Sequence, residues 1–131
     1  MFRRFVSGSV VASVAIAGGA MGVLLTPAAT QERVHVLTVA WCFVPAVWGL
    51  WAMFAPVGWV PQRFPIWGAI LGLVAGFMAA FVLNLPSRIL GGTVPVALRG
   101  VAVVVMVVFY YILWMLVRVA YRLLGTPTSA A

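Results

Sequence analysis

Four long stretches without a charged side chain constrain this chain more than any other feature. They cover residues 5–26, 36–55, 64–85 and 100–117, and each is mainly apolar. A helix needs about 20 such residues to cross a hydrocarbon core of roughly 30 Å. Unpaired backbone is costly in lipid, and the alternating pattern of a barrel strand is absent. The sequence therefore predicts an all-α integral membrane protein with four transmembrane helices, in a single domain over residues 1–131.

The few charged residues exclude other classes of protein. Nine of the 131 residues are charged, eight Arg and one Glu, whereas a soluble domain of this size carries roughly a quarter. The net charge of +7 comes from isolated arginines between apolar blocks. No basic run or basic helix face could follow a phosphate backbone. We therefore expect neither a soluble globule nor a nucleic-acid partner.

The first apolar stretch has a second interpretation, as a signal peptide. Arg3 and Arg4 precede it, and the small residues Thr26 and Ala28 could occupy the cleavage positions. The uncharged run over residues 5–26 is longer than the roughly 7 to 15 apolar residues of a secretory signal. We expect it to be retained as a span, whereas cleavage would leave three spans.

The arginines predict an orientation. Placing the N-terminus inside puts more arginines on the cytoplasmic side, with Arg3, Arg4, Arg63, Arg118 and Arg122 inside and Arg33, Arg88 and Arg99 outside. An even number of spans then places both termini in the cytoplasm. Arg118 and Arg122 lie four residues apart, and we expect them to anchor the last helix to lipid headgroups. The use of Arg in place of Lys, with abundant Ala, Val and Gly, favours a bacterial plasma (inner) membrane.

Small residues recur every four positions in the third stretch, at Gly68, Gly72, Gly76 and Ala80. Side chains four apart form one ridge of a helix, so this row predicts a shallow groove in which another backbone lies close. Gly18 and Gly22 form a shorter pair in the first stretch. We expect the first and third spans to pack closely, either with each other or across a homo-oligomer.

Aromatic residues with polar groups lie deep in the second and fourth stretches. Trp41 and Trp48 are seven residues apart around Pro45, and Tyr110 and Tyr111 lie near the centre of the fourth stretch. An indole N–H or a phenol at that depth needs a partner inside the protein or in a ligand. These four residues are candidates for contact with a lipid or ligand, and the alternative is plain packing in the bundle core.

The residues needed for most chemistry are missing. No Asp, Glu, His or Lys lies within the four stretches, which excludes the usual proton relays of transporters. One His, one Cys and one Glu cannot build a zinc site or a carboxylate pair, so we expect no metal, no cofactor and no catalysis. Cys42, inside a predicted span, is expected to be a buried, inert thiol. His35 at the outer mouth of the second span is either a wet surface residue or a ligand to a bound group.

Two functions are compatible with these features. The first is a small non-catalytic membrane protein, an accessory or assembly subunit or a homo-oligomer, which packs against other membrane proteins or itself through its small-residue faces. The second is a small transport or lipid- or quinone-handling protein, with a pathway lined by the deep aromatic residues. Membrane lipids are the expected partners in both cases.

Overall fold

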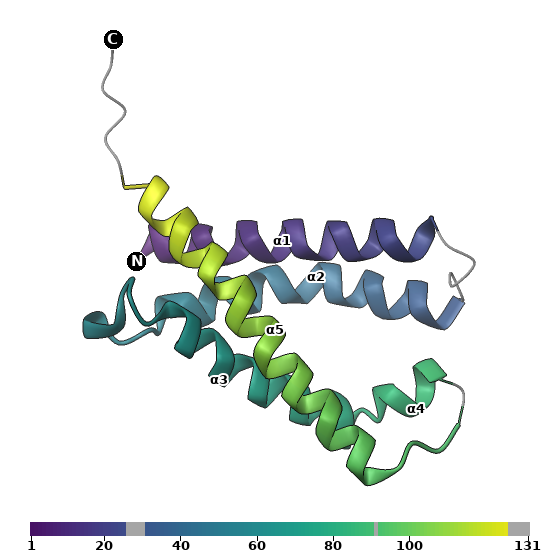
Figure 1. Cartoon of the computed structure of the whole chain (residues 1–131). Helices are drawn as coiled ribbons and strands as arrows, with labels where there is room; N and C mark the ends of the chain where they lie inside the picture. The colour runs from purple at the N-terminus through teal and green to yellow at the C-terminus, as the bar shows by residue number, and fades with distance from the viewer. Residues whose placement is uncertain (26–30, 91, 126–131) are drawn as a thin grey trace.

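Helices account for nearly all of the chain in the computed structural model, which describes residues 1–25, 31–90 and 92–125 (Figure 1). The elements in chain order are α1 (Phe2–Leu24), α2 (Gln31–Met53), the 3-10 turn η1 (Val57–Trp59), α3 (Phe64–Phe77), the π-helical turn η2 (Met78–Val82), α4 (Leu85–Leu90) and α5 (Val96–Leu123). No strand occurs in these ranges. Thr26 and Ala28, the residues of the alternative cleavage site, lie outside them.

Four helices are long and apolar enough to cross a membrane: Phe2–Leu24, Val34–Met53, Phe64–Val82 and Val96–Leu123. Few of their side chains are buried in the isolated chain, and the exposed side chains are largely apolar. Such a surface suits lipid and not water. The predicted all-α fold with four transmembrane helices is confirmed.

The ends of the third and fourth spans differ from the predicted ones. The third ends near Val82 because Asn84 adopts a left-handed backbone (φ 50°), which stops a helix. A short helix that was not predicted, α4, follows directly. The fourth span extends beyond residues 100–117 in both directions, so that Arg99 and Arg118 lie inside α5. Arginine is a good helix former, and its long side chain can reach the membrane surface from within a span.

The long helices pair as two antiparallel hairpins, α1 with α2 and α3 with α5 (Figure 1). Contacts between α1 and α5 join the hairpins. The prediction that the first and third spans pack with each other is therefore wrong within the chain. The small-residue row of α3 faces the bulky side of α5 instead.

The α3–α5 contact is close along this row. A Cβ on Gly68 would overlap the ring of Trp114, and one on Gly72 would lie 2.7 Å from Cβ of Tyr110. On Gly76 a Cβ would lie 3.1 Å from Cβ of Met106. The clearance thus grows along the helix, and Ala80 at the end of the row is buried. Three large side chains of α5 lie where α3 has no side chain.

The α1–α2 contact depends on single glycines that form no row. A Cβ on Gly8 would lie 2.7 Å from the carbonyl oxygen of Trp48, and one on Gly49 would overlap Phe5 and Ser9. The Ser9 hydroxyl donates to the carbonyl oxygen of Pro45 at 2.9 Å, while α2 continues as a helix through that proline. These contacts fix how closely α1 approaches α2.

Two arginines at the start of α1 bind the carboxyl ends of both hairpins. Arg3 donates from Nε to the carbonyl oxygen of Tyr121 at 2.7 Å, and its guanidinium lies 3.9 Å from the centre of the Tyr121 ring. Arg4 donates to the carbonyl oxygen of Ala55 at 3.0 Å. The last carbonyls of a helix have no partner within it and carry partial negative charge, so a guanidinium is well suited to them.

Candidate functional site

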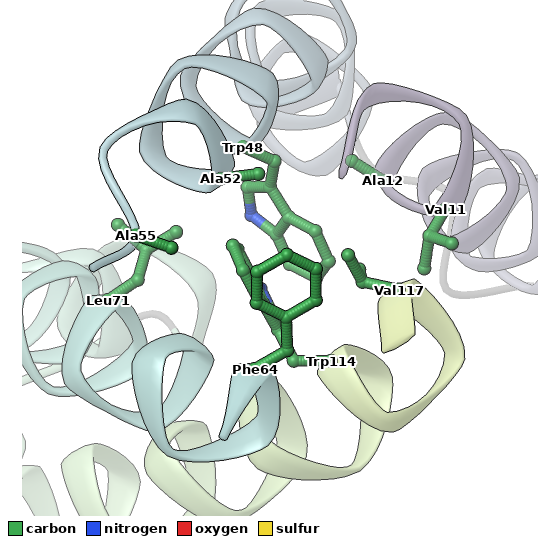
Figure 2. Close-up of a cluster of buried hydrophobic side chains, with 9 residues drawn as sticks. All are labelled: Val11, Ala12, Trp48, Ala52, Ala55, Phe64, Leu71, Trp114 and Val117. Carbon is green, nitrogen blue, oxygen red and sulfur yellow. The ribbon is translucent and has the colours of Figure 1, made fainter. Parts of the chain in front are cut away.

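The hairpins meet in an aromatic core built by all four long helices (Figure 2). The largest buried side chains are Trp48 of α2, Phe64 of α3 and Trp114 of α5. The ring of Trp48 lies 5.6 Å from that of Trp114, and Trp114 meets Phe64 edge to face at 5.9 Å. The remaining members are smaller: Val11, Ala12, Ala52, Ala55, Leu71 and Val117.

Two of the four predicted aromatic residues meet in this core. The rings of Trp48 and Tyr110 lie 4.9 Å apart, which brings α2 against α5. Trp41 and Tyr111 do not join them, because both are exposed on the outer surface of the bundle. Trp114 was missed by sequence reasoning, although it is fully buried. Its signal was the spacing of four from Tyr110, which places both on the face toward α3.

The indole N–H groups of Trp48 and Trp114 are both buried and neither has a well-aligned acceptor among the described residues, while the Trp48 side chain interacts with the hydroxyl of Tyr110. A partner inside the protein or in a ligand was expected for Trp48, and Tyr110 is the polar side chain that the structure brings to it. The hydroxyls of Ser13 and Thr38 do not serve the core, because they donate to carbonyls one turn back in their own helices, at 2.9 Å each. The core is thus rich in donors, and each unpaired donor lowers stability by ~1–3 kcal/mol.

A second tryptophan pair, Trp51 and Trp67, lies between the hairpins near the end of the bundle that carries Arg3 and Arg4. The N–H of Trp51 donates to the carbonyl oxygen of Trp67 at 3.0 Å, and the N–H of Trp67 donates to that of Trp51 at 2.8 Å. The rings stack at 4.8 Å. Trp59 meets the Trp67 ring edge to face, and the Arg63 guanidinium lies 5.7 Å from the centre of the Trp59 ring. Trp67 therefore satisfies a terminal carbonyl of α2 in the way that Arg4 satisfies others.

An open apolar groove of about 340 Å³ lies between α1 and α2. Its lining includes Trp41, Thr38 and Cys42. Cys42 is exposed there, so the prediction of a buried thiol is wrong: the span crosses the membrane, but this position faces outward from the chain. Thr38 also borders an adjoining groove with Gln31 and His35. His35 is exposed at this more polar mouth, as a surface residue would be.

Gly18 and Gly22 differ from the glycines of α3. Both are exposed, and a Cβ built on either would meet no atom within 4 Å. They make no close helix contact inside the chain. Packing of this pair against a second copy or another protein stays a prediction.

The remaining predicted residues lie at the ends of the bundle. Arg122 is exposed and Arg118 half-buried near the carboxyl end of α5, beside the start of α1. The side chains of Glu32 and Arg33 lie outside the described part of the molecule. Within that part, no three His, Cys, Asp or Glu residues come together as a metal site would require.

Four apolar spans with a lipid-suited surface define a multi-pass membrane protein. No protein-family model, curated protein or solved structure matches the chain.

Proposed function

We propose that this chain is a non-catalytic protein of the bacterial inner membrane, with both termini in the cytoplasm, that acts by assembling with other membrane helices. It serves as an accessory or assembly subunit, or as a homo-oligomer, and the contact surface is the Gly18–Gly22 face of α1. The observation that carries the proposal is the open space over these two glycines.

This face has the properties of an unoccupied helix interface. Gly18 and Gly22 form a Gly-xxx-Gly pair, which allows two membrane helices to approach closely. Val14 and Met21, at neighbouring positions on the same side of α1, are exposed as well. Ala20 and Leu24, about half a turn away, border the groove toward α2. The chain thus uses α1 for contacts with α2 and, around Val14, with α5, and it leaves the side of Gly18 and Gly22 open.

The ionisable side chains near the core support a role without catalysis. Among the described residues packed in or against the core, the ionisable side chains are the phenols of Tyr110 and Tyr121, and no acid, histidine or lysine lies there with them. General acid–base work needs a group that exchanges protons near neutral pH. The proposed orientation is supported by the arginine count, with five arginines at the end of the bundle where α1 begins against three at the other end.

The test compares the full chain with a Gly18→Leu/Gly22→Leu variant after mild-detergent purification. Size-exclusion chromatography with light scattering gives the oligomeric state, and mass spectrometry identifies co-purified proteins. Wild type should carry a second copy or a reproducible partner, and the variant should lose it because leucine side chains hold the helices apart. Gly100→Leu is the matched control, since Gly100 also has open space but lies on α5. An unchanged assembly in the variant, or a solitary wild-type chain, would contradict the proposal.

The groove between α1 and α2 favours a second candidate, the handling of a lipid or quinone. It is apolar, contains Trp41 and adjoins the more polar mouth with Gln31 and His35. Solvent extraction of the same purified protein distinguishes the assembly function from this candidate. One quinone or lipid molecule per chain would favour this candidate if the Gly18→Leu/Gly22→Leu variant retains it and His35→Ala loses it.

A further inference from the structure

A pocket of about 310 Å³ lies where α3, η2, α4 and α5 come together, at the end of the bundle away from Arg3. Its walls are almost entirely apolar, and they include Ala79, Ala80, Leu85, Leu90, Ala102 and Met106. The small-residue row of α3 ends here, beyond the part that α5 fills. The pocket has the chemistry of a site for a hydrocarbon chain.

The backbone beside this pocket is irregular. The last turn of the span is π-helical over Met78–Val82, and Asn84 has a left-handed backbone. Single π turns and such non-glycine conformations are frequent at binding sites. The side-chain oxygen of Asn84 is buried without a donor among the described residues. An acceptor is therefore left free one residue before Leu85 of the pocket wall.

Arg88 and Arg99 lie on α4 and α5, the two helices that supply part of the pocket wall. Arg99 donates from Nε to the carbonyl oxygen of Val94 at 3.0 Å, and the N–H of Val94 donates to the hydroxyl of Ser87 at 3.3 Å. Ser87 precedes Arg88 in α4, which supplies part of the pocket wall. These bonds tie the start of α5 to α4. Arg88 comes one helical turn after Leu85 of the pocket wall, and Arg99 one turn before Ala102, so each arginine is a helix-surface neighbour of a pocket residue. No carboxylate of the described residues neutralises them, and the one acid in the sequence is Glu32.

We propose that this is a binding site for an anionic phospholipid. One acyl chain lies in the pocket, and the phosphate lies between Arg88 and Arg99 at its edge. The assignment rests on charge complementarity at the rim and apolar walls below it. It goes beyond the proposed assembly function and does not depend on it.

Native mass spectrometry of the full chain in detergent with phosphatidylglycerol or phosphatidylcholine tests the site. Wild type should retain one phosphatidylglycerol with about tenfold or greater preference over phosphatidylcholine, as two arginines near a phosphate imply. Arg88→Gln/Arg99→Gln should lose this preference. Arg118→Gln/Arg122→Gln removes the same charge at the other end of the bundle and should keep it.

A second variant tests the pocket separately from the charges. Ala102→Phe fills the cavity and leaves every arginine in place, so it should also lose the retained lipid while its far-UV circular dichroism stays helical. Equal retention of both lipids by wild type would show annular lipid alone and overturn the site. An equal loss of preference in the two double-arginine variants, or full retention by folded Ala102→Phe, would overturn it as well.

Discussion

The two glycine rows of this chain share one spacing and lie in different surroundings. Gly68, Gly72 and Gly76 of α3 are covered by large side chains of α5, while Gly18 and Gly22 of α1 have open space. The difference shows that a Gly-xxx-Gly pattern predicts a close approach and does not name the approaching helix. In α3 the groove is filled by the chain's own last helix. In α1 it is available to a separate helix.

Among substitutions in the two glycine rows, Gly68→Ala is expected to change the unfolding free energy most. The added methyl would overlap the Trp114 ring, which is fully buried and cannot move aside without disturbing Phe64 and Trp48. Overpacking of a filled core costs about 1–3 kcal/mol, so we expect a loss near the upper end of this range although alanine is the better helix former. SDS-induced unfolding followed by far-UV circular dichroism measures it. Unchanged stability would mean that Trp114 does not lie over Gly68.

A smaller loss is expected from Gly76→Ala in the same row. The added methyl would lie 3.1 Å from Cβ of Met106, and a methionine side chain adapts readily. Part of the strain is offset by the higher helix propensity of alanine, so a loss of about 0.5–1 kcal/mol is expected. The same unfolding assay should rank Gly68→Ala above Gly76→Ala. The reverse order would contradict the increase in clearance along α3.

Gly18→Ala is expected to have the smallest effect on the unfolding free energy, and to raise it instead of lowering it. The methyl meets no atom, and alanine loses less conformational freedom than glycine when a helix forms. The unfolding free energy of the isolated chain should therefore rise by about 0.5 kcal/mol. Both proteins are measured at high dilution in detergent, so that assembly does not contribute to the difference in unfolding free energy. A clear loss under these conditions would place a neighbour over Gly18 within the chain.

Much of the architecture could be predicted because it depends on hydrophobicity along the chain. Span number, helix type and the closeness of the Gly68 row to a neighbour all follow from local pattern. The partner of that row could not be predicted, because the shape of Trp114 matters only once α5 is placed. Gly8 and Gly49 carry no spacing signal, yet each lies against a neighbouring helix as closely as the row does.

The candidate sites were less predictable for a similar reason. Trp48 and Tyr110 were correctly singled out as deep polar aromatics, but that they meet each other is a property of the packing. Arg3 and Arg4 were interpreted as orienting charges, and their hydrogen bonds to terminal carbonyls depend on where α2 and α5 end. The pocket beside Asn84 arises from an irregular turn that no periodic pattern in the sequence predicts.

The bond between Arg3 and Tyr121 joins residues 118 positions apart, almost the full span of the chain. During synthesis the first helix emerges long before its partner at the other end exists. Its two arginines can meet the end of α2 early, whereas the contact with α5 forms only after the helix that ends at Leu123 has been made. Closure of the bundle between α1 and α5 therefore follows synthesis of all four spans, whereas the α1–α2 hairpin can form before it.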